Sequence, residues 1–478
     1  MKRIIALTIM FALLLSCRPI DVLSDGTNVS IKKHAAVTKE AAAPAASVIP
    51  AAAVVSAIPP AKSELNTHTL AIIPSYTLAD CYQMALIQSE IIAINTDLIK
   101  EADAHYLIAL SEILPHVSFI STDYQETIPP DKGTTLGTLK PPKQSTRNFN
   151  VTQTLFNGFK AIAAIKGSGY EKKQRVDEKT RAEQLLLVDV ANAFYLLKEK
   201  RDDLRVLRKT RKALSNRVKE LIAREKLGRS KPSEVVNVKA QLYSVEASIE
   251  LAKSREITAR QLLEFLIGQP VGELSDVYPF PIKINSEEYY VSKADSRPDV
   301  RASKFAWQLS KENITVVDSG FLPEATLDAN YYVQRTGFYE TTDWDVGLTV
   351  NVPIFEGTEV LGKSKAANLQ ADERKEEYKR TRRKAPYDIK DSFVNLVGAM
   401  AVHDALKKAY SAARLNYYLQ RKDYERSLVN NLDVLTAIQT LEDAERNYIA
   451  SLYAAKRQYW QLRVAAGQSG TESLDESF

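Results

Sequence analysis

The stretch that decides the fold runs from Leu186 to Leu221 and reads LLVDVANAFYLLKEKRDDLRVLRKTRKALSNRVKEL. Its apolar residues recur every three or four positions, as in a helix that packs along another helix in a coiled coil. They are Leu186, Val190, Ala193, Leu197, Leu204, Leu207, Leu214, Val218 and Leu221, with Lys200 and Arg211 as interruptions. Because residues 160–224 contain no proline, we predict one helix of about 65 residues, roughly 100 Å long. A compact domain has no use for such a long rod.

This helix lies in the first of two copies of one pattern. Residues recur 199 positions apart without a gap: Phe156 and Phe355, Gly158 and Gly357, Asp189 and Asp388, Leu242 and Leu441. Upstream, Leu114-Pro115 corresponds to Leu322-Pro323 at an offset of 208, so copy one holds nine extra residues in between. We therefore predict repeat 1 over 76–268, a linker over 269–296 and repeat 2 over 297–467.

Both copies have the same order of elements: a helix, two strands, a long helix, a turn and a returning helix. Pro115 and Pro323 end the first helix of each copy, since proline cannot continue a helix. Two half-length helices therefore stack end to end beside one long helix. The predicted ranges are helices 78–112, 160–224 and 232–267 in copy one, with strands 117–125, 148–156, 325–333 and 344–355 in the two copies.

The turns after the long helices form hairpin tips, at Gly228 in copy one and at Ser427 in copy two. The strands cap the other end of the helical bundle. One residue departs from the repeat: Pro386 lies inside the long helix of copy two, where copy one has Leu187. An internal proline removes a backbone hydrogen bond, so we predict a kink or local break within one turn of Pro386.

The last strand alternates between apolar and small polar residues. Its apolar residues are Trp344, Val346, Leu348, Val350 and Val352, and between them lie Asp345, Gly347, Thr349 and Asn351. The apolar face would pack on a core in a soluble β-sandwich, or contact lipid in a barrel whose polar face lines a wet lumen. The strand alone favours the sandwich, and the long helices reverse that preference.

Four strands per chain cannot close a barrel, because the smallest closed barrels have about eight. Open sheet edges cannot lie in lipid, since their backbone groups would lack partners. If these strands span a membrane, several chains must therefore share one barrel: two chains would supply eight strands and three would supply twelve.

The N-terminus predicts export and lipidation. A positively charged start precedes a short apolar run, residues 4–15, which is too short to span a bilayer and fits a signal peptide. It ends in Leu14-Leu15-Ser16-Cys17, which resembles a bacterial lipobox. We therefore predict a signal peptide over 1–17 and a lipid on Cys17, with Arg18 favouring the outer membrane. The alternative is an ordinary signal peptide with an incidental cysteine.

Two further segments have compositions that cannot build a core. Residues 18–75, rich in Ala and Pro, are predicted to form an extended tether, and residues 468–478 a disordered tail. With Cys17 lipidated, Cys81 has no partner within the chain, so we predict a small buried residue and no disulfide framework.

Composition and motifs argue against an enzyme or a nucleic-acid-binding protein. The formal net charge of +5 includes Lys2 and Arg3 of the signal peptide, so the mature chain is nearly neutral. Five histidines lie scattered without metal-ligand spacing, and the sequence has no glycine-rich phosphate loop and no nucleophile elbow. We predict no catalytic residue, no metal and no cofactor besides the lipid on Cys17.

The repeat and its motifs together resemble the TolC-type outer-membrane factors. The motifs are a Leu-Pro before each first strand, TQTLFNG (152–158), NVPIFEG (351–357) and LDVL (432–435). With the lipobox, they point to the lipoprotein branch of the family. The resemblance implies an α+β membrane protein: a homotrimer whose long α-helical coiled-coil barrel continues into a 12-stranded transmembrane β-barrel, four strands per protomer. It also implies a periplasmic adaptor and an inner-membrane pump or exporter, in a Gram-negative bacterium.

This family closes its tunnel at the hairpin tips with an iris of acidic, tyrosine and arginine side chains. By the resemblance, Asp433 and Tyr424 belong to this periplasmic aperture. Thr436 stands where a second aspartate is common, and Val429 where an arginine can occur, so the charge network of the iris is reduced. A second interpretation is that Asp433 only caps the returning helix, and both can hold.

The leading hypothesis is thus a passive, trimeric exit duct of the outer membrane, gated at the helical tips, for tripartite efflux or type I secretion. The alternative is a lipid-anchored periplasmic coiled-coil scaffold without transport activity, its strands forming a soluble sandwich. Lipid exposure of Trp344, Val346, Leu348 and Val350 would favour the duct. A third option is a family member that has lost transport.

Overall fold

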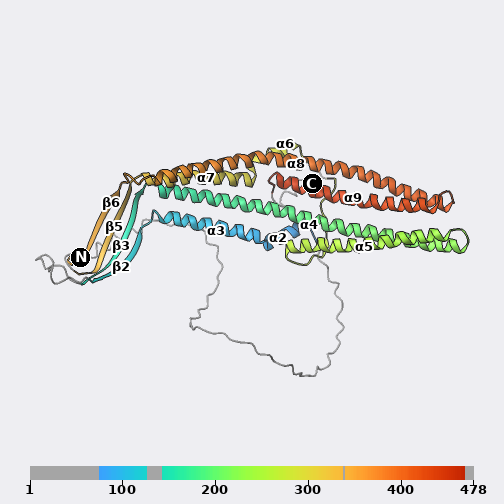
Figure 1. Ribbon diagram of the computed structural model, residues 1–478, viewed down its shortest axis with the longest axis horizontal. Helices are drawn as coiled ribbons and strands as arrows, with labels where there is room; N and C mark the ends of the chain where they lie inside the picture. The colour runs from blue at the N-terminus through green and yellow to red at the C-terminus, as the bar shows by residue number, and fades with distance from the viewer. Residues whose placement is uncertain (1–74, 126–142, 282, 337–339, 469–478) are drawn as a thin grey trace, which may run out of the picture. The chain divides into compact units, whose positions relative to one another are not determined.

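The computed structural model describes residues 75–125, 143–281, 283–336 and 340–468 (Figure 1). The predicted signal peptide with Cys17, the tether up to residue 74 and the tail from residue 469 lie outside these ranges. The two long helices, α4 (Lys160–Lys226) and α8 (Glu359–Glu425), have 67 residues each and begin 199 positions apart. The returning helices α5 (Pro232–Ile267) and α9 (Asn431–Ala465) begin at the same offset.

The first helix of copy one is broken, which corrects the prediction of a single helix over 78–112. It consists of α2 (Leu78–Gln88) and α3 (Glu90–Ser111), with Ser89 in an extended conformation between them. The break lies where α5 ends: a Cβ on Gly268 would stand 2.5 Å from the side chain of Gln88. In copy two a single helix, α7 (Pro298–Asp318), precedes the strands.

The four long strands form one antiparallel sheet in the order β2-β3-β5-β6. Their ranges are His116–Gln125, Lys143–Asn157, Glu324–Arg335 and Trp344–Asn351. The predicted strand 344–355 is too long, because Pro353 cannot donate to a strand ladder. The only other pairing among the described residues joins the two-residue strands β1 (Ser75–Tyr76) and β4 (Glu273–Leu274). A sandwich with a second sheet is therefore wrong for these residues.

The two faces of the sheet differ in chemistry. On one face, Oδ1 of Asn330 accepts from Nδ2 of Asn148 at 2.8 Å and of Asn150 at 3.0 Å. Nδ2 of Asn330 donates to Oδ1 of Asp345 at 2.9 Å. On the other face, register places one aromatic residue per strand in a row: Phe119, Phe149, Tyr331 and Trp344. This split suits a sheet between water and lipid.

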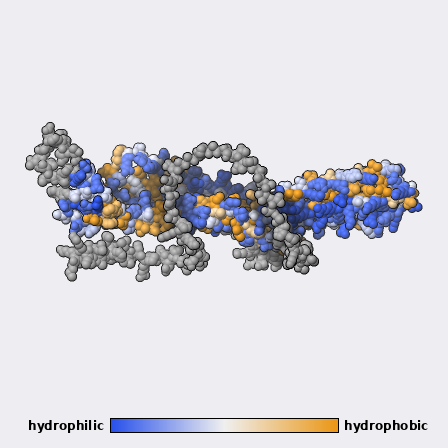
Figure 2. All heavy atoms as spheres, turned by 90° about the horizontal axis from the view of Figure 1, so that it is seen from below, coloured by the Kyte–Doolittle hydropathy of each residue, from blue (hydrophilic) through white to orange (hydrophobic). Residues whose placement is uncertain are grey.

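The helices follow the same order as the strands (Figure 1). α4 lies between α2, α3 and α5 on one side and α7 and α9 on the other, and α8 packs on α7 and α9. The predicted coiled-coil stripe is buried, from Val190 through Leu197 and Leu207 to Leu221. Cys81 is a buried free thiol, and burial raises its pKa to about 12. Figure 2, which looks onto the edge of β2, α3 and α5, shows orange hydrophobic surface on the strands and helices there.

The linker between the copies includes α6 (Glu287–Val291) and a short helix η3 (Ala294–Ser296), and η4 (Ser319–Phe321) follows α7. α8 continues through Pro386 without interruption, so the predicted local break is wrong. The predicted kink stays a prediction. None of the described helices combines the length and the apolarity that crossing a membrane requires.

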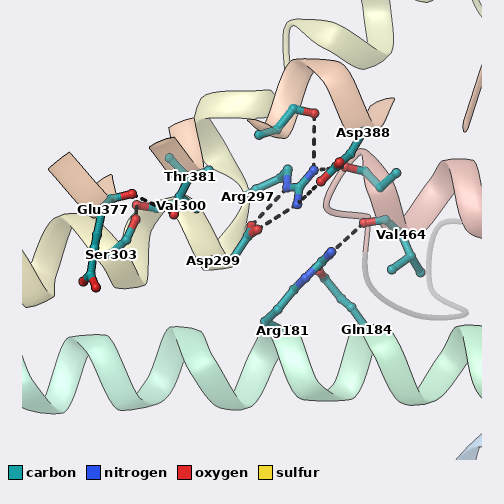
Figure 3. A network of polar contacts seen from close by, with 12 residues as sticks. Arg181, Gln184, Arg297, Asp299, Val300, Ser303, Glu377, Thr381, Asp388 and Val464 are labelled. Carbon is teal, nitrogen blue, oxygen red and sulfur yellow. Dashed lines mark hydrogen bonds and ion pairs between the residues drawn. The ribbon is translucent and has the colours of Figure 1, made fainter. Parts of the chain in front are cut away.

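A buried arginine joins the end of α9 to the start of α7 (Figure 3). Arg297 is 2% exposed and pairs through Nη2 with Asp299 at 2.7 Å and with Asp388 at 3.4 Å. Its Nη1 donates to the carbonyls of Ala385 and Ala465 at 3.3 and 3.2 Å. We call Arg297, Asp299 and Asp388 the mid-length joint, because the start of α7 meets the end of α9 there, beside the long helix α8.

Candidate gate at the helical tips

Both helical hairpins turn through a residue with positive φ. Gly228 (φ 70°) follows α4, and Ser427 (φ 61°) follows α8. Glycine adopts this conformation without a Cβ clash, whereas serine does so with strain. The Ser427 N–H donates to the Tyr424 carbonyl at 3.0 Å, and the Leu428 N–H donates to the Asp423 carbonyl at 2.9 Å. The turn thereby satisfies carbonyls at the end of α8.

Asp433 lies in the first turn of α9 and belongs to a capping box. Its carboxylate accepts from the Asn430 backbone N–H at 3.0 Å. Oδ1 of Asn430 accepts in return from the N–H groups of Leu432 and Asp433, at 2.8 and 3.0 Å. Asn430 is therefore the N-cap, and Asp433 is the reciprocal partner three residues later. The capping interpretation of Asp433 holds in this form.

Tyr424 packs inside the second hairpin against two arginines of α4. Its ring centroid lies 3.6 Å from Cζ of Arg217 and 4.6 Å from Cζ of Arg224. Arg217 also donates from Nε to Oδ1 of Asn431 at 3.1 Å and from Nη1 to Oε2 of Glu220 at 2.9 Å. Glu220 pairs in turn with Arg224 at 3.1 Å. We call these five residues the tip clasp, because they tie α4 to both helices of the second hairpin.

The tip clasp is incompletely paired. Arg217 is 6% exposed, and within the described part of the chain its buried Nη2 has no hydrogen-bond partner. An unmade hydrogen bond of this kind costs about 1–3 kcal/mol. Stacking of a desolvated guanidinium on an aromatic ring contributes about 2 kcal/mol in the opposite direction. The two effects are of similar size, so the stacking and the unpaired donor of Arg217 largely offset each other.

A cavity of about 560 Å³ adjoins the clasp between α4, α8 and α9. Its lining includes four cationic side chains, from Lys209, Lys212, Arg217 and Arg421, and two acidic ones, from Glu220 and Glu425. The wall therefore carries net positive charge. Beside this cavity the second hairpin packs on α4 through a hydrophobic core that includes Leu214, Leu221 and Val434.

The structure places Tyr424 and Asp433 beside the second hairpin turn, in surroundings that sequence reasoning missed. The hydroxyl of Thr436 donates to the Leu432 carbonyl at 3.0 Å, and Val429 packs on the hydrophobic tip core. The cationic charge beside Tyr424 comes instead from Arg217 and Arg224, which lie on the other long helix. The one local signal is that Arg217 directly precedes Val218 of the apolar stripe. Its stacking partner is more than 200 residues away, so periodicity cannot reveal it.

The other predicted site residues lie far from the tips. Trp344, Val346, Leu348 and Val350 are 63%, 54%, 62% and 56% exposed along one face of β6. Cys17 lies outside the described residues. In the described ranges, no three His, Cys, Asp or Glu side chains are placed to hold a metal ion.

Comparison with known proteins shows to which family this architecture belongs. Residues 82–269 and 290–468 match the family described as outer membrane efflux protein. The chain is similar to outer membrane protein TolC of Vibrio cholerae, with 24% identity over 312 residues that cover 62% of this chain and 71% of that protein. It is 22% identical to TolC of Salmonella enteritidis over 358 residues, which cover 69% of this chain and 70% of that protein.

Solved structures share the fold. Superposition on the outer membrane protein VceC of Vibrio cholerae gives a TM-score of 0.72 at 19% identity, over 82% of this chain and 96% of that chain. The CmeC outer membrane channel of Campylobacter jejuni gives 0.71 at 17% identity, over 84% and 88% of the two chains.

Proposed function

This chain belongs to the outer membrane efflux protein family and is a non-enzymatic efflux channel of the outer membrane, and we propose that it works as a passive trimeric duct gated by the tip clasp. The observation that carries the trimer is the sheet. Among the described strands, β2 and β6 have one neighbour each, and one face is apolar while the other is polar. Three such sheets joined edge to edge would make a closed barrel of twelve strands with an apolar outside.

A passive duct works together with other proteins of the cell envelope. A duct without an energy source needs a pump, so we propose a periplasmic adaptor and an inner-membrane pump or exporter. We also propose that the mature chain begins at a lipidated Cys17 and is anchored in the outer membrane of a Gram-negative bacterium. The lipobox-like Leu14-Leu15-Ser16-Cys17 supports this anchor. Mass spectrometry of the mature N-terminus tests it, and an unmodified N-terminal peptide would refute it.

Gating at the tips rests on the geometry of the clasp. Arg217 and Arg224 of α4 hold Tyr424 of α8, so the second hairpin cannot move away from α4 while the stacking persists. The first experiment is single-channel recording of the purified protein in planar bilayers, with Tyr424→Ala alongside. We expect discrete steps from a trimer and a larger conductance from the variant. A well-folded trimer that never inserts or conducts would favour the alternative of a family member that has lost transport.

A further inference from the structure

The chain has two unequal edges. One edge consists of β2, α3 and α5 (Figure 2), and the other consists of β6 and α8. Two different edges can pair only head to tail, and a head-to-tail contact forms a ring when its rotation closes. In the proposed trimer, β6 of one copy therefore meets β2 of the next. This contact between copies, which we call the seam, rests on that proposed function, and the strand register decides which residues face each other across it.

The internal repeat relates the strand register of one copy to that of the other, because residues of the two copies correspond at constant offsets. Adding 208 to a residue of β2 and 199 to a residue of β3 converts the pair His116–Thr152 into Glu324–Asn351. The structure contains this pair in the β-hairpin of copy two, β5–β6. The pair Phe119–Phe149 likewise becomes Leu327–Leu348, which the structure also contains. The two β-hairpins, β2–β3 and β5–β6, thus have the same register although their sequences differ.

The junction between the copies provides the template for the seam. β3 is the last strand of copy one and pairs with β5, the first strand of copy two. At the seam, β6 ends copy two and meets β2, which begins copy one of the next chain. Seven successive pairs from Asn148–Tyr332 to Thr154–Thr326 share one register at the internal junction. The same offsets convert Asn150–Asn330 into Thr349–Thr122.

We propose that β6 pairs antiparallel with β2 of the next copy in the register that places Thr349 opposite Thr122. Residues 347–351 of one chain then face residues 120–124 of the next. The register puts Val352 beside Phe119, so apolar residues meet on the apolar face. Thr349 and Thr122 meet on the polar face, whereas a slip of one residue would turn the apolar face of β6 toward the lumen.

The test is disulfide cross-linking of Thr122→Cys/Thr349→Cys in the full-length, detergent-extracted protein. Directly opposed strand residues have Cα atoms about 4.5–5.5 Å apart, within disulfide range. Diagonal neighbours lie roughly 7–8 Å apart and bond poorly. The matched controls are Thr122→Cys/Gly347→Cys and Thr122→Cys/Asn351→Cys, which test registers slipped by two residues in either direction. We expect covalent trimers on a non-reducing gel, at least tenfold above both controls and above the single variants.

A second cysteine pair tests the register independently, in case the first double variant does not fold. Ser121→Cys/Val350→Cys reports the same register from the other face and must agree. Stronger cross-linking by either control, or none from any pair in a protein that remains trimeric, would overturn the proposed register while leaving the duct intact. A wild-type protein that is monomeric in detergent would instead sink the proposed trimer itself.

Discussion

Arg297 in the mid-length joint and Arg217 in the tip clasp are equally buried, but their hydrogen-bonding groups are not equally used. Arg297 bonds two carboxylates and two backbone carbonyls. Arg217 bonds one carboxylate and one carboxamide, stacks on a ring, and leaves Nη2 unpaired within the described residues. Breaking the first arrangement leaves two partly buried carboxylates without their cation, whereas breaking the second releases a donor that had no partner. The joint is therefore the more fully paired of the two, and the clasp is the part that we propose to open.

Electrostatics at the joint agree with this view. Burial by itself raises the pKa of Asp299, but the hydrogen bond and charge of Arg297 outweigh it, so the pKa lies below its ordinary value. The acid stays ionised in the folded chain, and the guanidinium keeps its partner. Arg181 of α4 adds to this: it lowers the pKa of Asp299 further and donates to the Val464 carbonyl at 3.0 Å.

The largest expected effect follows from removing the joint cation. Arg297→Met leaves Asp299 and Asp388 without their buried partner, which costs about 3–5 kcal/mol of unfolding free energy. Denaturant unfolding followed by helical circular dichroism measures this loss. The matched control is Arg297→Met/Asp299→Asn/Asp388→Asn, which removes the stranded charges and should recover much of the stability. A loss below about 1 kcal/mol in the single variant would mean that Arg297 stabilises the joint no more than Arg217 stabilises the tip clasp.

Removing the tip cation should act mainly on gating. Arg217→Met loses the stacking on Tyr424 but also removes the unpaired Nη2, so the net cost is about 1–2 kcal/mol, less than at the joint. Single-channel conductance should rise, because Arg224 alone then holds the Tyr424 ring against α4. Lys212→Met changes a cation of the same cavity outside the clasp and should leave conductance near wild type. Equal effects of both variants would assign gating to cavity charge instead.

Sequence reasoning predicted the parts of this comparison unevenly. The long helices begin where the pattern placed them, because apolar periodicity is a local property of α4 and of its copy α8. The break at Ser89 and the unbroken helix at Pro386 were missed, since both depend on packing. α5 ends against Gln88, and Ala385 and Ile389 on the two sides of the proline are buried in one hydrophobic cluster. The clasp was missed for the same reason: Arg217 and Tyr424 are neighbours only after folding.

A smaller effect separates the two interpretations of Asp433. Asp433→Ala removes one side of the capping box and should cost about 1 kcal/mol of stability. Asn430→Ala removes the other side of the same box and leaves the aspartate in place. We expect similar stability losses, and a larger conductance only for Asp433→Ala if its charge narrows the aperture. Matching conductances in bilayers would leave Asp433 with a capping role alone.

The smallest expected effect comes from His403, a buried base on α8 with no acid bonded to it in the described residues. Its Nδ1 lies 3.1 Å from Oγ of Ser451, and the rings of Phe280 and Tyr448 cover it. Burial lowers the pKa of His403 below its usual 6.5, and the nearby charge of Asp404 offsets this only in part. Because the unfolded chain binds this proton more readily, stability is fully present above about pH 6.5 and is lost as the pH falls toward the folded pKa. The slope is at most about 1.4 kcal/mol per pH unit, and His403→Gln should flatten it in unfolding measured between about pH 5 and pH 7.5. An unchanged slope would mean that His403 keeps a partner for its charged form, as Arg297 does, and belongs with the joint.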